Sequence, residues 1–229
     1  MRLVLFDIDG TILTARGAGR RALAAALNEV YGTAGDIERY DLRGRTDPRI
    51  VFDLMEGAGL SRPAVRGRLD ACFEAYARGL AAEVGDGSGV VTLPGIADLV
   101  RRLDSAPEAL VGLLTGNIEA GARIKLEPTG LQPYFRLGAY GSDHLDRRQM
   151  PSLAARRAEA LTGHSFRPEK VLVIGDTPHD IECARHFGAV AVAVATGQYR
   201  RDELEAFSPD LLFSDFSDVE GALAKLLSR

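Results

Sequence analysis

The sequence predicts an α/β fold, in which a parallel sheet lies between helices and carries an inserted, all-helical domain. Short apolar runs alternate along the chain with segments of helical periodicity. The interval between the first two runs departs from this alternation, because it shows helical patterns alone. The length of 229 residues exceeds the usual size of one domain and leaves room for an insertion.

The expected strands are short runs of apolar, often β-branched residues that end in a polar residue or a glycine. Their length and composition are typical of parallel strands buried on both faces. We place them at residues 3–6, 109–114, 171–174, 190–194 and 211–213. Because parallel strands need crossover connections, helices are expected between them.

Helical periodicity fills the intervals between the later strands. We expect helices at residues 96–103, 118–126, 153–161 and 181–187, and a last one in which Val219, Leu223, Leu226 and Leu227 share one face. Alternating strands and helices predict a Rossmann-like parallel sheet with helices on both faces.

Residues 14–89 interrupt this pattern and are interpreted as helical throughout. Apolar residues recur at helical spacing in three stripes, which contain Leu23, Leu27 and Val30, then Val51, Leu54, Met55 and Ala58, then Val65, Leu69, Cys72, Phe73 and Tyr76. Thr46 followed by Asp47 and Pro48 predicts a helix start, with a capping hydroxyl and a proline in the first turn. We therefore expect a Rossmann-like core domain at 1–13 and 90–229 and an inserted helical domain at 14–89, which ends in a glycine-rich linker.

Composition narrows the class of protein. The sequence is 46% hydrophobic and 26% charged, which is typical of a globular protein. A formal net charge of −4 argues against nucleic acid or an anionic membrane surface as a partner. No apolar run approaches the ~20 residues that span a bilayer, and two cysteines cannot form a disulfide framework. We expect a cytoplasmic protein, and the sequence does not distinguish a monomer from a dimer.

The first strand ends in two acidic residues, Asp7 and Asp9. In an extended chain, residues two apart point the same way, so both carboxylates can face the crevice at the carboxyl end of the strand. Two neighbouring carboxylates repel each other strongly unless a cation lies between them.

Two later strands also end in polar residues. Thr115, Gly116 and Asn117 follow the second expected strand, and a helix begins at once, which is a suitable arrangement for binding an anion. Asp176 follows another strand, and Asp180 lies one helical turn further on. Carboxylates and hydroxyls gathered at one sheet edge predict a site for Mg²⁺ and a phosphate group.

These motifs resemble those of the haloacid dehalogenase superfamily in order and spacing across the whole chain. The segments concerned are 7–11, 115–117 and 175–180, and the helical insertion resembles the cap of the phosphoglycolate phosphatase and β-phosphoglucomutase subgroup. The resemblance implies Asp7 as nucleophile, Asp9 as general acid and then base, and Thr115 as a phosphoryl ligand. It also implies that Mg²⁺ is held by Asp7, Asp176 and the Asp9 backbone carbonyl, with Asp180 close by. The implied phosphate-binding set comprises Gly10, Thr11, Thr115, Gly116 and Asn117.

One motif departs from that family. The superfamily places a lysine or arginine before the helix that precedes Asp176, and no lysine occurs between Lys125 and Lys170. Arg147 and Arg148 are both candidates for the catalytic cation, and spacing does not choose between them. Arginine is chemically adequate, because its fork can hold a carboxylate and a phosphoryl oxygen together.

The resemblance implies a Mg²⁺-dependent phosphatase that acts on a small phosphorylated metabolite and is similar to phosphoglycolate phosphatases. Asp9 argues against a dehalogenase, and the absence of lysine from residues 14–89 argues against a phosphonatase. Two alternatives remain, a β-phosphoglucomutase-like phosphomutase and a non-catalytic protein that binds a phosphate ligand. Arg43 and Arg45 in the cap are candidates for substrate contacts.

Overall fold

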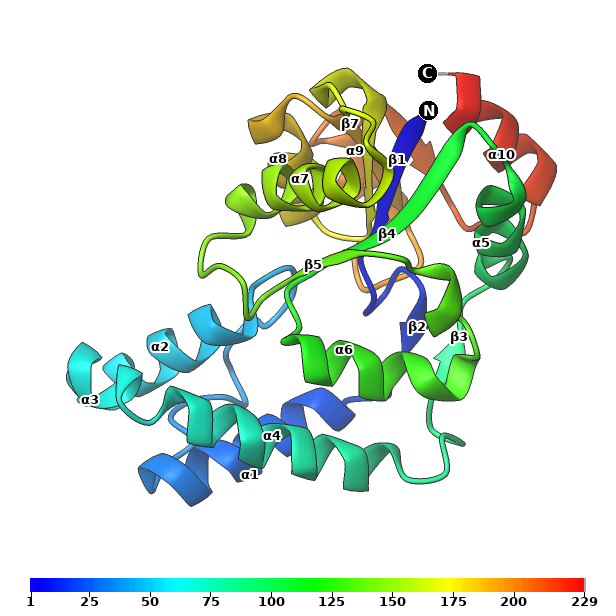
Figure 1. Cartoon of the computed structure of the whole chain (residues 1–229). Helices are drawn as coiled ribbons and strands as arrows, with labels where there is room; N and C mark the ends of the chain where they lie inside the picture. Colours follow the sequence, from blue (N-terminus) through cyan, green and yellow to red (C-terminus); the bar gives the residue numbers. More distant parts are fainter. Residues whose placement is uncertain (229) are drawn as a thin grey trace.

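Six parallel strands form the central sheet of the computed structural model, which describes residues 1–228 (Figure 1). They are β1 (Arg2–Phe6), β4 (Ala109–Thr115), β5 (Gly138–Tyr140), β6 (Val171–Gly175), β7 (Val190–Val194) and β8 (Leu211–Phe213). The order β5-β4-β1-β6-β7-β8 places β1 between β4 and β6. The predicted α/β fold is confirmed, although the short strand β5 was not expected.

Helices cover both faces of this sheet. Along β1, Val4 and Phe6 belong to one hydrophobic cluster, and Leu3 and Leu5 belong to another, as the alternation of side chains in a strand requires. Helices α5 (Ile96–Ser105) and α10 (Val219–Ser228) lie on the first face, and α7 (Met150–Thr162) and α8 (Pro178–Phe187) lie on the second. The remaining helical segments of this part are α6 (Glu119–Leu126), α9 (Arg201–Glu205), η1 (Glu127–Thr129), η2 (Gln132–Tyr134), η3 (Arg147–Gln149) and η4 (Pro168–Lys170).

The segment between β1 and β4 supplies a separate group of helices beyond the carboxyl ends of the strands (Figure 1). They are α1 (Ala18–Tyr31), α2 (Asp47–Gly57), α3 (Arg62–Arg66) and α4 (Leu69–Val84), and α1 packs against α4. Thr46 caps α2 as predicted, since its side chain accepts a hydrogen bond from the Arg49 backbone. We call these four helices the cap; its predicted boundaries, 14 and 89, stay a prediction.

The expectation that this segment is helical throughout was wrong at residues 32–46, which form turns and loops. Gly32 ends helix α1 with a positive φ angle, where glycine carries no steric penalty, and Gly35 in the following turn also has a positive φ. The Arg20 guanidinium then donates to the backbone carbonyls of Ile37 and Tyr40. A side chain of α1 therefore supplies hydrogen-bond donors for two carbonyls of this loop.

The prediction of no strand in residues 14–89 was also wrong at one position. Thr14 belongs to β2 (Leu13–Thr14), which pairs antiparallel with β3 (Val91–Thr92). The two short strands lie where the chain leaves the sheet and returns to it, so their pairing connects the two ends of the insertion. A two-residue strand has no apolar run of its own, and its pairing is a tertiary contact.

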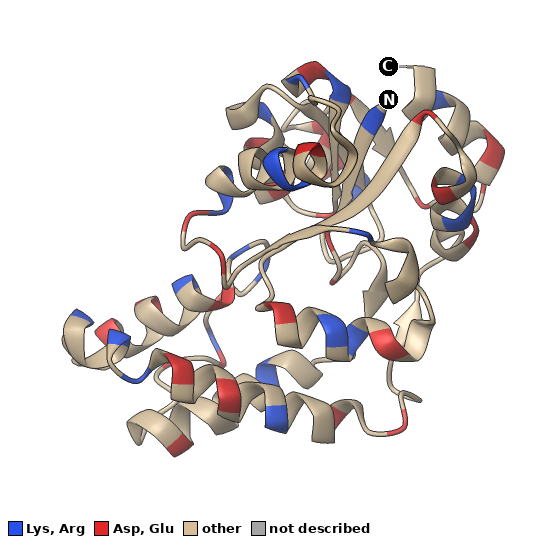
Figure 2. Cartoon of the chain, in the orientation of Figure 1, with Lys and Arg blue, Asp and Glu red and all other residues tan. Residues whose placement is uncertain are grey.

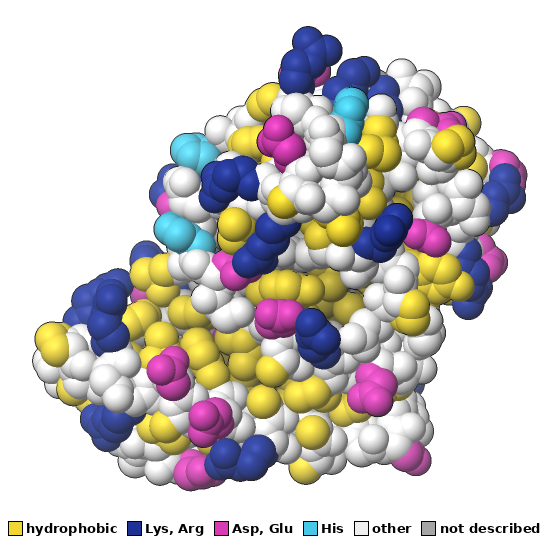
Figure 3. All heavy atoms as spheres, viewed as in Figure 1, with side chains coloured by type: hydrophobic (Ala, Val, Ile, Leu, Met, Phe, Trp, Pro, Cys, Tyr) yellow, Lys and Arg dark blue, Asp and Glu magenta, His cyan; other side chains and the backbone are white. Residues whose placement is uncertain are grey.

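The surface carries charges of both signs. Figure 2 shows Lys and Arg interspersed with Asp and Glu over the sheet-bearing part and the cap helices. Figure 3 shows hydrophobic side chains between the charged ones on this face, over α4 and α6 in the orientation of Figure 1. Within residues 1–228, no helix combines the length and apolar character needed to cross a membrane.

Candidate active site

The functional side chains lie at the carboxyl edge of the sheet, at the ends of three adjacent strands. Asp7 follows β1, Thr115 ends β4 and Asp176 follows β6. Asp7, Asp176 and the two residues after Thr115, Gly116 and Asn117, line one end of a cavity of about 460 Å³, whose other walls include cap residues and residues 196–198. The size and the convergent polar groups are typical of a small-molecule site.

Three buried carboxylates form a cluster at this end of the cavity, and two of them, Asp7 and Asp176, line it. Asp7, Asp176 and Asp180 each offer an oxygen atom within 4.8 Å of the others. The Thr11 hydroxyl donates to Asp176 Oδ1 at 3.3 Å. Asp180 is already engaged, because its Oδ2 accepts from the backbone N–H and the hydroxyl of Thr177 at 3.0 and 2.6 Å. Asp7 and Asp176 therefore keep more of their oxygen atoms free for a ligand.

Burial dominates the electrostatics of this cluster. It raises the pKa of Asp7 to about 6, and the charge of Arg147 opposes this rise while those of Asp180 and Asp9 add to it. Burial also raises the pKa of Asp176 well above its usual range, with further contributions from Asp180 and Asp7. The cluster thus holds more negative charge than its protein surroundings neutralise, and a bound cation would relieve the repulsion.

The structure distinguishes the two arginines that the sequence left open. Arg147 is buried, and its Nη2 lies 2.6 Å from Asp180 Oδ1 and 3.2 Å from Asp7 Oδ1. Burial alone would lower the Arg147 pKa, but the carboxylates of Asp180 and Asp7 hold it above its usual value. Arg148 points away, is 59% exposed and pairs with Asp146 at 2.8 Å. Arg147 is therefore the cation of the carboxylate cluster.

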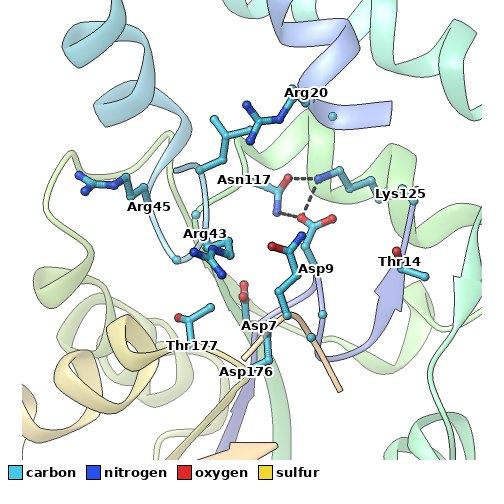
Figure 4. Close-up of a pocket in the computed structure, with 18 of the residues that line it drawn as sticks. Asp7, Asp9, Thr14, Arg20, Arg43, Arg45, Asn117, Lys125, Asp176 and Thr177 are labelled. Carbon is cyan, nitrogen blue, oxygen red and sulfur yellow. Dashed lines mark hydrogen bonds and ion pairs between the residues drawn. The ribbon is translucent and has the colours of Figure 1, made fainter. Parts of the chain in front are cut away.

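Asp9 takes no part in that cluster and is held from a different side (Figure 4). Its Oδ2 accepts hydrogen bonds from Asn117 Nδ2 at 2.8 Å and from Lys125 Nζ at 2.6 Å. Asn117 also donates to Thr115 Oγ1 from its backbone N–H and its side chain, at 3.3 and 2.8 Å. Because these contacts occupy Thr115 Oγ1 as an acceptor, its hydroxyl proton can point into the site.

Two glycines among the predicted site residues are required by close contacts. Gly10 has a φ of +82°, and a Cβ there would collide with the Asp176 carboxylate. A Cβ at Gly116 would collide with the backbone carbonyl of Arg45 in the cap. Glycine at these positions allows the turn after β1 to contact Asp176 and the cap to contact the end of β4.

The two candidate cap arginines lie on the cavity wall in different ways. Arg43 is near the carboxylates, whereas Arg45 is directed away from them (Figure 4). The Arg43 guanidinium donates two hydrogen bonds to Asp41, at 2.8 and 2.9 Å, and lies over the ring of Tyr199, 4.5 Å from its centroid. Arg45 lies 3.6 Å from Asp53. Both guanidinium groups thus have carboxylate partners within the chain.

The cap is also joined to the core by backbone contacts beside the site. The Asp47 backbone N–H donates to the Gly116 carbonyl at 2.8 Å, and the Asp47 carboxylate accepts from the Ile118 backbone at 2.8 Å. Arg147 Nη1 donates to the Gly44 carbonyl at 3.4 Å. The segment 44–47 therefore completes the wall around the end of β4.

Sequence reasoning gave no role to Lys125 or Arg20 and assigned Asp47 to a helix start, and all three line the cavity. One signal was available for Lys125, since it lies eight residues after Asn117, about two turns along the following helix. A lysine between Ile124 and Leu126 on a short helix resembles an exposed charge. No comparable signal exists for Asp47, whose role depends on the contact of the cap with the core.

The fold and the site define a hydrolase of the haloacid dehalogenase (HAD) type, and comparisons with known proteins agree. The HAD-hydrolase-like family matches residues 151–219. A phosphoglycolate phosphatase of Synechococcus elongatus is 31% identical over 232 aligned residues, which cover all of both chains.

Solved structures share the whole fold. CbbY from Rhodobacter sphaeroides, solved in complex with phosphate, aligns with a TM-score of 0.72 at 21% identity over 96% of each chain. A hydrolase from Pseudomonas syringae aligns with a TM-score of 0.68 at 22% identity, over 98% of this chain and 99% of its own. The chain belongs to the haloacid dehalogenase superfamily and is a phosphoric monoester hydrolase of that superfamily.

Proposed function

We propose that the protein is a Mg²⁺-dependent phosphatase that hydrolyses a small phosphate monoester through an aspartyl-phosphate at Asp7. One observation carries this proposal above all others. Three buried carboxylates cluster at the end of a cavity that also contains hydroxyl and amide donors, and two of them, Asp7 and Asp180, contact the buried guanidinium group of Arg147. Such a site matches a hard cation together with a phosphate group.

The donor set fits a magnesium ion. Asp7 and Asp176 offer the free carboxylate oxygens, and the Asp9 backbone carbonyl is a further candidate ligand. Asp180 accepts hydrogen bonds from Arg147 and Thr177 and contributes its negative charge. Mg²⁺ bound there supplies positive charge that offsets the repulsion between the Asp7 carboxylate and a phosphate dianion.

Asp7 and Asp9 divide the chemistry between them. A carboxylate oxygen of Asp7 attacks phosphorus as the bond from phosphorus to the ester oxygen breaks. The departing oxygen takes a proton from Asp9, which later accepts a proton from the water that hydrolyses the aspartyl-phosphate. Asp9 is thus protonated again at the end of the cycle, by the proton from water, and the products are an alcohol and phosphate.

The remaining polar groups bind the phosphoryl oxygens that carry charge in the transition state. Thr115 offers its hydroxyl proton, and the amides near Gly116 and Asn117 lie at the end of β4. Arg147, fixed between Asp7 and Asp180, supplies the positive charge. Gly10 and Thr11 form the turn that brings the backbone next to Asp176.

A small phosphorylated metabolite is the substrate we propose. The cavity of about 460 Å³ holds a metabolite rather than a polymer, and the whole chain aligns with a phosphoglycolate phosphatase. Arg43, which lies near the carboxylates, is the cap residue best placed to contact the part of the substrate beyond the phosphate. A cytoplasmic location remains a prediction from the sequence.

Phosphate release from a panel of phosphomonoesters tests the proposal, with Mg²⁺ and with a chelator. The panel contains phosphoglycolate, sugar phosphates, nucleotides and 4-nitrophenyl phosphate. We expect release that requires the metal, and the order of rates identifies the substrate. Asp7→Asn should abolish turnover and leave the circular dichroism spectrum unchanged, so substantial residual activity would disprove the nucleophile assignment. Interconversion of sugar phosphates without release would identify a phosphomutase instead.

A further inference from the structure

Lys125 is a buried charge to which the proposed reaction gives no role. It lies on α6, and only 5% of its side chain is exposed. Burying an ammonium group is costly unless it is paired and hydrogen-bonded. Its Nζ has two partners, both in the site, namely Asp9 Oδ2 at 2.6 Å and Asn117 Oδ1 at 2.6 Å. The lysine therefore contacts the proposed general acid directly, from the side opposite Asp7 (Figure 4).

Lys125, Asn117 and Asp9 form a closed triangle of hydrogen bonds. Asn117 accepts from Lys125 through its oxygen and donates to Asp9 through its nitrogen, so both donors converge on Asp9 Oδ2. Among residues 1–228 no hydrogen bond reaches Asp9 Oδ1. Because the Asp9 side chain is 45% exposed, packing alone does not fix its rotamer, and the triangle restrains it.

We propose that Lys125 is a positioning residue that holds Asp9 in the orientation needed for proton transfer. Oδ2 can keep both hydrogen bonds in either protonation state, because the carbonyl oxygen of a carboxylic acid also accepts. The proton that moves between Asp9 and the leaving oxygen is then carried on Oδ1. This inference deepens the proposed function and rests on it.

A purely structural role is the competing explanation. Lys125 Nζ lies under the cap, where a Cβ built on Gly19 would be 3.4 Å away, and its charge also acts on the buried Asp47. On that reading, loss of the lysine would loosen the contact between cap and core. All substrates would then be affected alike, whereas a role through Asp9 depends on how much the leaving group needs a proton.

The experiment compares kcat/KM for an alkyl phosphate and for 4-nitrophenyl phosphate in the same enzyme preparation. An alkoxide is a poor leaving group and requires the proton from Asp9, whereas 4-nitrophenolate departs without one. General acid catalysis typically contributes about 10²–10⁴ in rate. We expect Lys125→Met to lower kcat/KM for the alkyl ester at least about tenfold and that for the aryl ester less than about threefold.

Matched variants keep the result interpretable. Arg123→Met changes an exposed cation of the same helix, paired with Glu119, and should leave the ratio of the two esters unchanged. In an Asp9→Asn background, Lys125→Met should not change the ratio further, because both act on the same proton. The ratio does not depend on the fraction of folded enzyme, and Lys125→Gln serves if the methionine variant yields no folded protein.

If Lys125→Met lowered kcat/KM by the same factor for both esters, or for neither, the positioning role would be overturned while the wild-type protein remained an active phosphatase. A further fall in the ratio in the Asp9→Asn background would also overturn it. A wild-type protein that released phosphate from neither ester would instead overturn the proposed function, and the inference with it.

Discussion

Replacing Arg147 by methionine removes the guanidinium group that contacts the carboxylate cluster. Arg147 Nη2 lies 2.6 Å from Asp180 and 3.2 Å from Asp7, and its side chain is 7% exposed. Breaking a buried ion pair by removing one partner typically costs about 3–5 kcal/mol, because it leaves a charge buried without compensation. We expect a loss of about this size in the free energy of unfolding of the metal-free protein at pH 7.

The loss should depend on conditions in a way that identifies its cause. At pH 5 it should shrink, because Asp7, whose pKa is about 6, and Asp176, whose pKa is also raised, can take up protons in place of the guanidinium charge. Turnover should fall about 10²-fold or more, since Arg147 is proposed to bind the phosphoryl group in the transition state.

Urea unfolding at pH 5 and pH 7, with a chelator present, measures the stability, and phosphate release measures the turnover. Arg148→Met is the matched comparison. Its side chain is exposed and pairs with Asp146 outside the site, so we expect no measurable change in the urea midpoint or in turnover. If Arg148→Met were the more damaging of the two, the placement of the cation at Arg147 would be wrong.

Two further predictions concern Asp47 and the metal. Burial raises the pKa of Asp47 from 3.8 to about 6, so its contribution to stability is present below about pH 4 and is lost as the pH rises through 6, by about 3 kcal/mol. Asp47→Asn keeps an acceptor for the Ile118 N–H. Its free energy of unfolding in urea should therefore rise relative to that of the wild type between pH 4 and pH 7, and parallel pH profiles would contradict this. Mg²⁺ at about 100 times its Kd should raise the Tm of the wild type by roughly 5–10 °C, and Asp176→Asn should lose this shift in differential scanning calorimetry; an equal shift in the variant would place the ion elsewhere.

The parts of the fold that the sequence predicts are those that its local pattern determines. Strands β7 and β8 match the predicted ranges, because each is a continuous apolar run, buried along most of β7 and half-buried in β8. Strand β5 has three residues, begins with Gly138 and lies at an edge of the sheet, so its pairing with β4 creates a strand where the sequence shows no run. The loop at residues 32–46 likewise depends on Arg20, a residue of another element.

The same distinction applies to the site. The proximity of Asp7, Thr115 and Asp176 could be predicted from the sequence, because parallel strands present their carboxyl ends at one edge of the sheet. The choice between Arg147 and Arg148 could not be made, since both lie on the short helix η3, where successive side chains point about 120° apart. Only the contact of η3 with α8 decides which arginine faces Asp180. Lys125 was missed for a similar reason, because its partner Asp9 lies 116 positions away in the sequence.

The carboxylates and the cap are held in different ways, and this difference bears on how substrate enters. Asp7 and Asp176 directly follow the buried strands β1 and β6, so their positions are set by the sheet. The cap segment 44–47 meets the core largely through hydrogen bonds that involve backbone groups, at Gly44, Asp47 and Gly116. A hydrogen bond of this kind contributes only about 1 kcal/mol net, because water replaces it when it opens. We therefore predict that segment 44–47 can part from the end of β4 without disturbing the carboxylate cluster, while α4 stays packed against α6, and that its return closes the cavity around the phosphate.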